Sequence, residues 1–247
     1  MKEGGVRILS GVEHQPLISI ITVTYNAAHL LPEYLNNVLP YVNAEVELVI
    51  LDGNSTDGSI DILAQHNSKI TYWRSESDQG IYDAMNKAIS YAKGGWLYFM
   101  GADDRLLGGF GKMGRHLTQP ATVYYAKVVF WGEIAGGALK KYDLTKIDIC
   151  HQSIFYPRRV FDKYKYETRY PVYADQHLNL SLFGDRKFQW KFVDELVAIY
   201  DTRGFSAGSK DPEFDKHYDQ MVKQHLGLWV YARHLFRVMK KGRRQRN

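Results

Sequence analysis

Near the N-terminus the chain reads Ile18-Ser19-Ile20-Ile21-Thr22-Val23-Thr24-Tyr25-Asn26, a run of apolar and β-branched residues that ends in two polar side chains. Such a run predicts a buried strand over 18–24, and Asn26 is expected to cap the helix that follows. Three similar runs, at 46–51, 70–74 and 96–100, alternate with segments of helical spacing that begin near 30, 59 and 80. Regular alternation of strands and helices indicates βαβ units, and therefore an α/β fold with a mainly parallel central sheet flanked by helices.

The second half of the chain alternates less regularly. Strands are predicted at 122–131, 154–156, 188–193 and 197–200, and a helix at 174–183. Gly94-Gly95 is expected to end the helix that starts at Gly80, as a C-cap. Without a repeat or a low-complexity linker, the simplest division is one domain over 1–220 and a basic helical tail over 221–247.

Composition excludes several classes of protein. With 247 residues, 45% of them hydrophobic and 24% charged, the chain has ordinary globular values. The sequence has no run of 18 apolar residues, so no membrane-spanning helix is expected. It also has no apolar run of signal-peptide length near Met1, so export is not expected. Cys150, the single cysteine, has no partner for a disulfide, which fits a reducing cytosol, and is expected to be a small buried apolar residue.

The net charge of +5 is concentrated at the C-terminal end. Residues 221–247 carry eight basic side chains and no acidic one, so the rest of the chain has a net charge of −3. A mildly acidic body argues against nucleic acid as a partner, although the pI is about 9.0.

Acidic or polar residues follow each of the first four predicted strands. In an open parallel sheet, ligands bind beyond the carboxyl ends of the strands, where loops and helix N-termini converge. Any one of these residues alone is better explained as a helix cap or a turn residue; four in succession indicate a binding site. They are Tyr25 and Asn26, Asp52, Asp78, and Asp103 with Asp104.

The pair Asp103-Asp104 carries the most information. Adjacent carboxylates after an apolar strand repel one another unless a cation or hydrogen-bond donors lie between them. Mn²⁺ or Mg²⁺ prefers such oxygen ligands and commonly shares them with substrate phosphates, so the pair indicates a metal-bound diphosphate. The alternative is an exposed acidic turn.

Four blocks of this sequence resemble family 2 glycosyltransferases with the GT-A nucleotide-diphospho-sugar transferase fold, especially bacterial enzymes of surface-polysaccharide assembly. The blocks are Ser19–Asn26, Asp52–Ser59, Ser75–Lys87 and Gly101–Asp104. The resemblance is strongest over 17–107, which implies a nucleotide-sugar-binding half there and an acceptor half over 108–220.

The resemblance also implies roles for single residues. Tyr25, with Asn26 beside it, and Asp52 would hold the nucleobase, while Asp103 would lie near the ribose and metal and Asp104 would ligate the metal. Donor sugar or phosphates would lie beside Asp78 and Gly80, supported by Asn86 and Lys87. For Lys87 the alternative is a helix-surface ion pair with Asp83.

An inverting displacement needs a general base for the acceptor hydroxyl. The segment 173–180 resembles the family's acidic motif, which makes Asp175 the expected base, although Gln176 replaces the usual second acidic residue; the alternative is an N-cap carboxylate. His151 and Gln152 resemble a polar pair that lines the acceptor or metal region in related sequences. The alternative is that they only form hydrogen bonds that stabilise the fold. Arg203 is predicted as a phosphate clamp on a closing loop, or as part of a plain surface loop.

The last helix is predicted to be amphipathic. Leu228, Trp229, Phe236 and Met239 share its apolar side, and Arg233 and Lys240 are among the basic residues on the other. Such a helix suits the surface of an anionic membrane, although it can equally dock on the body with a solvated basic face.

Together these features predict a metal-dependent, inverting glycosyltransferase that moves a sugar from a nucleoside diphosphate, UDP by family habit, to a hydroxyl. The expected acceptor is a lipid-linked or growing saccharide, and the expected location is cytoplasmic, peripheral on the inner face of the bacterial membrane. Two alternatives remain: a nucleotide-sugar-binding scaffold that lacks a competent base, and a sugar nucleotidyltransferase.

Overall fold

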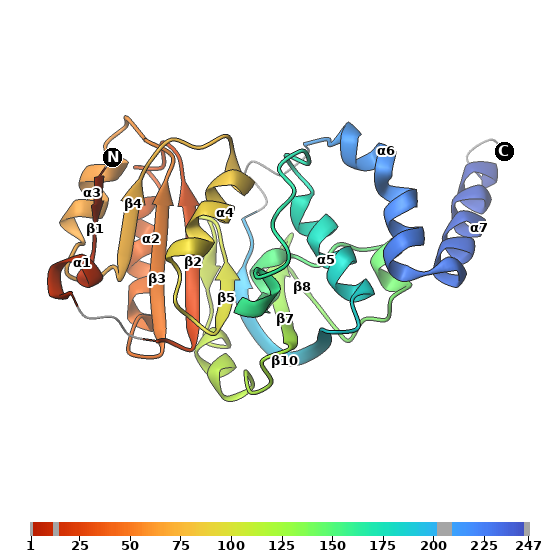
Figure 1. The fold of residues 1–247 in the computed structure, drawn as a ribbon, viewed down its shortest axis with the longest axis horizontal. Helices are drawn as coiled ribbons and strands as arrows, with labels where there is room; N and C mark the ends of the chain where they lie inside the picture. The colour runs from red at the N-terminus through yellow and green to blue at the C-terminus, as the bar shows by residue number, and fades with distance from the viewer. Residues whose placement is uncertain (1, 12–14, 202–208, 245–247) are drawn as a thin grey trace.

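One sheet forms the centre of the computed structural model, which describes residues 2–11, 15–201 and 209–244, and the C-terminal helices extend beyond it (Figure 1). Its strands are β1 (Lys2–Gly4), β2 (Ile18–Thr24), β3 (Val46–Asp52), β4 (Tyr72–Ser75), β5 (Trp96–Phe99), β6 (Arg105–Leu106), β7 (Thr122–Phe130), β8 (Glu133–Ala135), β9 (Ile154–Pro157) and β10 (Gln189–Ile199). They lie in the order β1-β4-β3-β2-β5-β9-β7-β10-β6, and β8 pairs with β7.

Helices cover both faces of this sheet. They are α1 (Val6–Ser10), α2 (Leu31–Val38), α3 (Ser59–Gln65), α4 (Ile81–Tyr91), α5 (Ala174–Gly184), α6 (Pro212–Met221) and α7 (Leu228–Arg244). Short helical turns are η1 (Leu39–Tyr41), η2 (Phe110–Arg115), η3 (Asp143–Thr145), η4 (His151–Ser153), η5 (Arg158–Val160) and the π-turn η6 (Val222–Leu226).

Two hydrophobic cores follow from the alternation of side chains along the strands. In β3, Val49 and Leu51 join a core with α4 and α5, whereas Leu48 and Ile50 join a second core with α2 and α3. Because successive side chains of a strand point to opposite faces, a continuous apolar run is expected when both faces are covered. The predicted strand at 46–51 is such a run.

The α/β fold class predicted from the sequence is confirmed, and the expected strands and helices from β2 to β5 begin within two residues of their expected positions, whereas β1 and α1 were not predicted. Strands β4, β3, β2 and β5 are parallel. Beyond them the sheet is mixed, because β9 runs antiparallel to both β5 and β7 while β10 runs parallel to β7. The carboxyl ends of β2, β5, β7 and β10 therefore lie at the same edge.

Three local predictions were wrong. Asn26 does not cap α2, since its backbone has φ +48° and its amide oxygen accepts the Thr56 N–H at 3.0 Å. Helix α4 ends at Tyr91 with an extended C-cap residue, so Gly94 is not a C-cap; it is needed because a Cβ there would lie 2.5 Å from the Ser19 nitrogen. The two strands predicted over 188–200 are one strand, β10, with irregular register in its second half.

A buried ion pair fastens the N-terminal segment to the sheet. The Arg7 guanidinium donates to Glu47 at 2.5 Å, and Glu47 also accepts from the Ser19 hydroxyl at 2.5 Å and from the Gly94 amide at 3.1 Å. Because the Glu47 side chain is almost fully enclosed, removing either charge would leave the other unpaired in a region of low dielectric constant.

The C-terminal helices α6 and α7 lie at the end of the molecule opposite the N-terminus (Figure 1). Phe214 of α6 and Val222 and Leu226 of η6 belong to the core that includes α5, and Val230 and Tyr231 of α7 pack against it. Among the described residues, none of the helices is both long and apolar enough to cross a bilayer.

Candidate functional site

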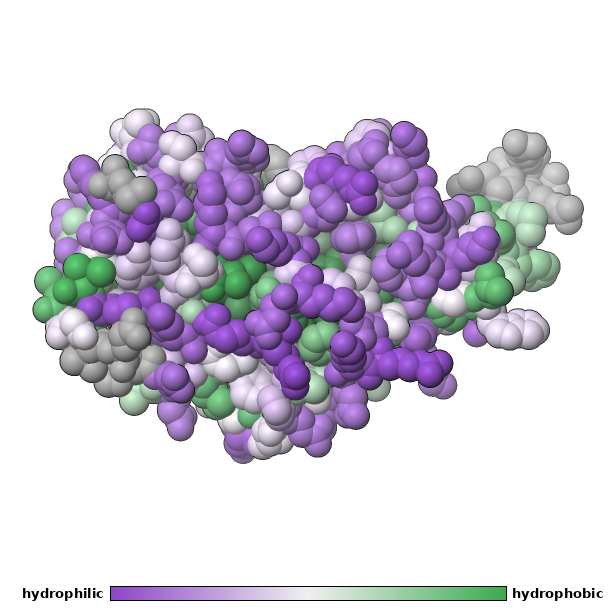
Figure 2. All heavy atoms as spheres, in the orientation of Figure 1, coloured by the Kyte–Doolittle hydropathy of each residue, from purple (hydrophilic) through white to green (hydrophobic). Residues whose placement is uncertain are grey.

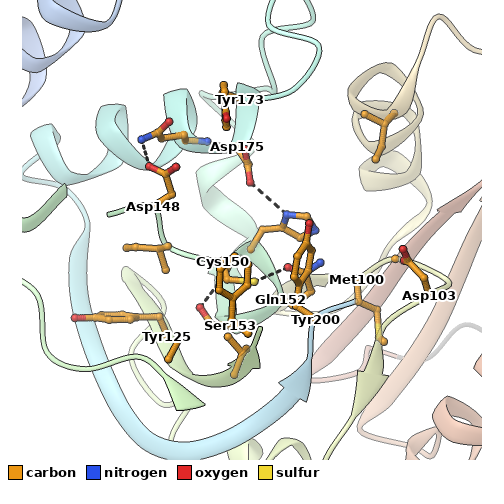
Figure 3. Close-up of a pocket in the computed structure, with 18 of the residues that line it drawn as sticks. Met100, Asp103, Tyr125, Asp148, Cys150, Gln152, Ser153, Tyr173, Asp175 and Tyr200 are labelled. Atoms are coloured by element: carbon orange, nitrogen blue, oxygen red, sulfur yellow. Dashed lines mark hydrogen bonds and ion pairs between the residues drawn. The ribbon is translucent and has the colours of Figure 1, made fainter. Parts of the chain in front are cut away.

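A pocket of about 910 Å³ opens at the sheet edge where β2, β5 and β7 end. Its wall is formed by the residues after β2 and β5, the β7–β8 hairpin, residues 147–153 and the start of α5. In Figure 3, Asp103 lies on one side of the pocket, Asp148 and Tyr125 on the other, and Asp175 between them. The site is thus built from both halves of the chain.

Tyr25 and Gly53 form the end of the site beside β2 and β3. The Tyr25 side chain lines the pocket and is 70% exposed, as a ring offered to a ligand would be. A Cβ on Gly53 would lie 2.6 Å from Asp78 Oδ2 and 3.3 Å from Tyr25 Cδ2, so glycine is what allows these side chains to approach. Asp78 Oδ1 accepts the Gly80 N–H at 2.8 Å, directly before α4 begins. Three of the predicted donor-binding residues, Tyr25, Asp78 and Gly80, are therefore brought together.

Asp52 is placed differently from the expected direct contact with a base. Its side chain is fully buried, and its two oxygens accept hydrogen bonds from the Ser55 amide at 2.9 Å and from the hydroxyls of Ser55 at 2.5 Å, Ser75 at 2.8 Å and Thr24 at 3.3 Å. These bonds occupy the lone pairs of a carboxylate. Asp52 therefore shapes the loop beside Tyr25, and contact with a base stays a prediction that requires some of these bonds to break.

Asp103 and Asp104 have separate environments. Asp103 lies on the pocket wall, whereas Asp104 is 2% exposed and accepts hydrogen bonds from the Gly101 amide at 2.7 Å, the Gln152 side chain at 2.7 Å and the Asp201 amide at 3.0 Å. Burial, followed by the charge of Asp103, raises the pKa of Asp104 to about 6. A Cβ on Gly101 would overlap Asp103 Oδ1, so only glycine permits this arrangement.

Asp103, on the pocket wall, is placed to meet a hard divalent cation, whereas Asp104 would reach the same cation only if some of its three hydrogen bonds broke. No group of three or more His, Cys, Asp or Glu side chains suited to a metal occurs among the described residues. Mg²⁺ and Mn²⁺ commonly take one or two carboxylates and complete their shell with water and substrate phosphates. Burial and the neighbouring charge of Asp103 disfavour the ionised form of Asp104, and a bound cation would offset both effects.

Asp175 and His151, predicted separately, form a hydrogen-bonded pair. His151 Nδ1 lies 3.2 Å from Asp175 Oδ2, and Asp175 Oδ1 accepts from the Tyr82 hydroxyl at 3.0 Å and from the Gln176 amide at 2.8 Å. Burial lowers the pKa of His151, but the hydrogen bond to Asp175 and the charges of Asp175, Asp104 and Asp103 outweigh it and raise the pKa above its usual value. The N-cap of α5 is Tyr173, so the alternative role of Asp175 as a side-chain cap is not seen.

Asp148 is a pocket carboxylate that the sequence analysis missed. The Gln176 side chain donates to it, and its partial removal from water and the charge of Asp175 raise the pKa of Asp148 to about 6. It lies in a loop with no strand end or motif to mark it. Gln176, the replacement for a second acidic residue, thus contacts a carboxylate supplied by another segment.

Gln152 lines the pocket and also contacts the Asp pair. It is buried, donates to Asp104, and accepts from the half-buried Cys150 thiol at 2.8 Å. Burial raises the pKa of Cys150, so this residue stays a neutral thiol.

Two predicted donor-binding residues lie outside the pocket wall. The Asn86 side chain is bonded to the Tyr166 main chain through both its amide nitrogen, at 2.8 Å, and its oxygen, at 2.9 Å. Lys87 pairs with Asp83 at 2.8 Å, the alternative considered from spacing. Arg203 lies outside the described residues.

Polar and acidic side chains beyond the carboxyl ends of parallel strands mark the ligand-binding edge of an open α/β sheet. The sequence model described as "Glycosyl transferase family 2" matches residues 19–134. Over 238 residues the chain is 34% identical to a PGL/p-HBAD biosynthesis glycosyltransferase of Mycobacterium bovis, covering 87% of this chain and 89% of the relative. The chain belongs to glycosyl transferase family 2 and is a glycosyltransferase.

Solved structures show the same fold. Staphylococcus aureus TarS 1–349 in complex with UDP-GlcNAc matches with a TM-score of 0.60 and 16% identity, over 83% of this chain and 65% of that one. Pyrobaculum calidifontis mannosyltransferase PcManGT in complex with GDP-Man and Mn²⁺ matches with a TM-score of 0.58 and 17% identity, over 92% and 76%. The fold is therefore GT-A, as the sequence resemblance predicted.

Proposed function

We propose that the protein is a metal-dependent, inverting glycosyltransferase that uses a nucleoside-diphosphate sugar and acts in the biosynthesis of a bacterial cell-surface glycoconjugate. The observation that carries this proposal is the opposition of Asp103 and the Asp175–His151 pair across one pocket. A relative whose name refers to PGL/p-HBAD biosynthesis supports the surface product. UDP is the proposed leaving group because TarS binds UDP-GlcNAc; the GDP-Man of PcManGT makes GDP the alternative.

The donor would lie along the strand ends from β2 to β5. Tyr25 offers its exposed ring to the base, Gly53 keeps the space beside it open, and the first turn of α4 after Gly80 supplies the positive end of a helix near the phosphates. Asp103 and Asp104 would hold the metal. When bound, the metal would offset the negative charge that develops on the departing diphosphate.

Asp175 is the proposed base. Its Oδ1 is oriented by Tyr82 and by the Gln176 amide, so Oδ2 is the oxygen that shares His151 and can take the proton of an acceptor hydroxyl. Attack from the side opposite the diphosphate breaks the anomeric C–O bond as the new one forms, which inverts the anomeric configuration. His151 holds Asp175 in place and, when protonated, lowers its basicity.

The test is a panel of nucleotide sugars assayed by thermal shift with and without Mn²⁺, followed by detection of the released nucleoside diphosphate. A ligand at 100 times its Kd stabilises the fold by about 2.7 kcal/mol, which thermal shift detects easily. Asp103→Asn should abolish the effect of Mn²⁺ on the thermal shift produced by the donor. Binding without turnover for every donor would favour the scaffold, and pyrophosphate release from a nucleoside triphosphate and a sugar phosphate would favour the nucleotidyltransferase.

We also propose that α7 attaches the protein to the inner membrane surface. One side of α7 docks on the body through His234, 2.9 Å from Asp219, and through Arg237, which donates to the Thr145 carbonyl. The other side presents exposed apolar residues, including Trp229, which is 91% exposed, and Phe236. The docked side agrees with the alternative of a helix packed on the body, and the exposed apolar side supports the proposed attachment; Figure 2 shows hydrophobic surface at this end of the molecule.

Flotation with anionic liposomes tests this attachment. Truncation at Gln220 is unsuitable because it also removes buried residues of η6, so the variant is the double change Trp229→Ser with Phe236→Ser. Each substitution removes an aromatic ring that would bury apolar area in the lipid, and such burial contributes about 25 cal/mol per Å² to binding. Lipid binding should therefore fall at least tenfold. The matched control is Ile8→Ser with Leu9→Ser on α1, an exposed apolar pair at the opposite end (Figure 1). An equal loss in both variants would contradict a specific role of α7.

A further inference from the structure

The pocket continues past the proposed reaction centre to an apolar wall. Along the edge of the sheet the order is β2, β5, β9, β7 and β10, so the residues that follow β7 and β10 lie beyond Asp103 as seen from Tyr25. Phe130 and Trp131 at the end of β7 line this part, and Phe130 stacks on Tyr200, with ring centroids 5.3 Å apart at 27°. Leu139 and Ile147 complete the wall.

Trp131 occupies a position where folding alone would not select tryptophan. Residues 131 and 132 are the two-residue turn of the β7–β8 hairpin, since Phe130 pairs with Glu133. Both residues have positive φ, +54° for Trp131 and +76° for Gly132. A two-residue hairpin turn of this kind favours asparagine or glycine in its first position. The indole is nevertheless 69% exposed, and its one ring contact within the described part of the chain is edge-on with Phe130. A bulky side chain held in a disfavoured backbone conformation without burial points to a ligand.

The charge of the pocket restricts what that ligand can be. The described lining contains the carboxylates Asp103, Asp148 and Asp175, and contains neither lysine nor arginine. A phosphate next to the apolar wall would meet this negative charge, and His151, the one basic side chain in the described lining, is already paired with Asp175. A neutral apolar group would meet matching side chains and would cover Trp131.

We infer that the acceptor is a neutral, amphipathic glycoside whose apolar aglycone packs on Phe130, Trp131, Leu139 and Ile147 while its sugar hydroxyl faces Asp175. This inference rests on the proposed glycosyl transfer and names its acceptor class. A saccharide carried directly on a lipid diphosphate would place charged phosphates against apolar side chains and is disfavoured at this wall. The apolar contact places the hydroxyl by binding energy from a part of the substrate that does not react.

Binding is tested first, independently of turnover. Protein labelled with 5-fluorotryptophan is titrated, in UDP and Mn²⁺, with methyl and n-octyl glycosides of the same hexose and with n-octyl phosphate. The Trp131 resonance is assigned by its loss in Trp131→Phe, and Trp229, also exposed, is the internal control for unspecific detergent contact. The octyl glycoside should shift Trp131 with a Kd at least tenfold lower than the methyl glycoside. Equal affinities, equal responses of Trp131 and Trp229, or equal binding of octyl phosphate would overturn the inference.

Kinetics then separate this inference from the proposed function. Trp131→Gly removes the indole and suits the positive φ, so the hairpin is expected to keep its turn. It should raise KM for the octyl acceptor about tenfold and leave KM for the donor within twofold, while Trp131→Phe stays near the parent. Transfer with an unchanged acceptor KM in Trp131→Gly would refute the apolar site alone. Absence of transfer to any acceptor, with the Trp131 response intact, would instead refute the proposed transferase reaction. Lost liposome binding with normal KM would assign Trp131 to the membrane and overturn the inference.

Discussion

Asp175→Asn is the change that tests the proposed chemistry most directly, because it removes the base and keeps the shape of the side chain. The carboxylate accepts three hydrogen bonds, from Tyr82, the Gln176 amide and His151. Asparagine Oδ1 can keep the first two, and its NH₂ group can donate to Nδ1 of neutral His151 in the other tautomer. Stability should therefore fall by about 1 kcal/mol or less.

Activity should respond far more than stability. Loss of a positioned general base costs about 10²- to 10⁴-fold in kcat, which corresponds to about 3 to 5 kcal/mol in activation free energy. The assay measures nucleoside-diphosphate release at saturating donor, with donor binding followed by thermal shift and unfolding followed in urea. Donor affinity should change by less than threefold, since Asp175 is proposed to act on the acceptor.

Asp148→Asn is the matched control, because it removes the same charge from the same pocket. It should lower kcat by less than about tenfold, since Asp148 lies outside the His151 pair and is bonded to Gln176. The reasoning would be refuted if Asp175→Asn kept kcat within threefold of the parent. A large loss in Asp148→Asn alone would move the base to that residue.

Three further changes have expected outcomes. Gly53→Ala should raise the donor Kd about tenfold because its Cβ would displace the side chains beside it, while Gly108→Ala, with open space around its Cβ, should leave the donor Kd unchanged in the same titration. Glu47→Gln should lower the free energy of unfolding by about 3 kcal/mol in urea, since it breaks an enclosed ion pair far from the pocket; a change below 1 kcal/mol would mean that the pair contributes little. His177 and His225 are both partly buried, and this burial holds their pKa values below the usual 6.5; for His177 the charge of His225 contributes as well. The unfolded state therefore binds protons at a higher pH than the folded state, and the free energy of unfolding should fall as pH drops below about 6.5. His177→Leu should reduce this dependence by up to about 1.4 kcal/mol per pH unit, and an unchanged slope would contradict the protonation argument.

The placement of the polar residues after the first predicted strands could be predicted from the sequence because it is locally encoded. Each polar residue there follows directly on a strand whose apolar run is recognisable, and parallel strands bring their carboxyl ends to one edge. Tyr25, Asp78, Gly80 and Asp103 therefore lie together as expected. Lys87 shows the limit of the same approach, since its place in a matching block did not bring it to the pocket.

The residues on the proposed acceptor side of the pocket could be placed only from the folded chain. Asp148 follows no strand, and Trp131 was expected as the last residue of a strand rather than as the tip of a hairpin beside the pocket. Helix α7 likewise has one amphipathic pattern but two separate surfaces, one docked through His234 and one exposed at Trp229.

By itself the sequence determined the α/β alternation, the family, and the polar residues at the ends of the first strands, because hydrophobic period and turn residues act within a few positions of the chain. Only the tertiary structure decided that Asp175 bonds to His151, that Gln152 encloses Asp104, and that Asp52 is turned inward. These contacts join residues as many as 48 positions apart. Which groups meet, and which lose their water, depends on how distant segments pack, and local pattern carries no record of that.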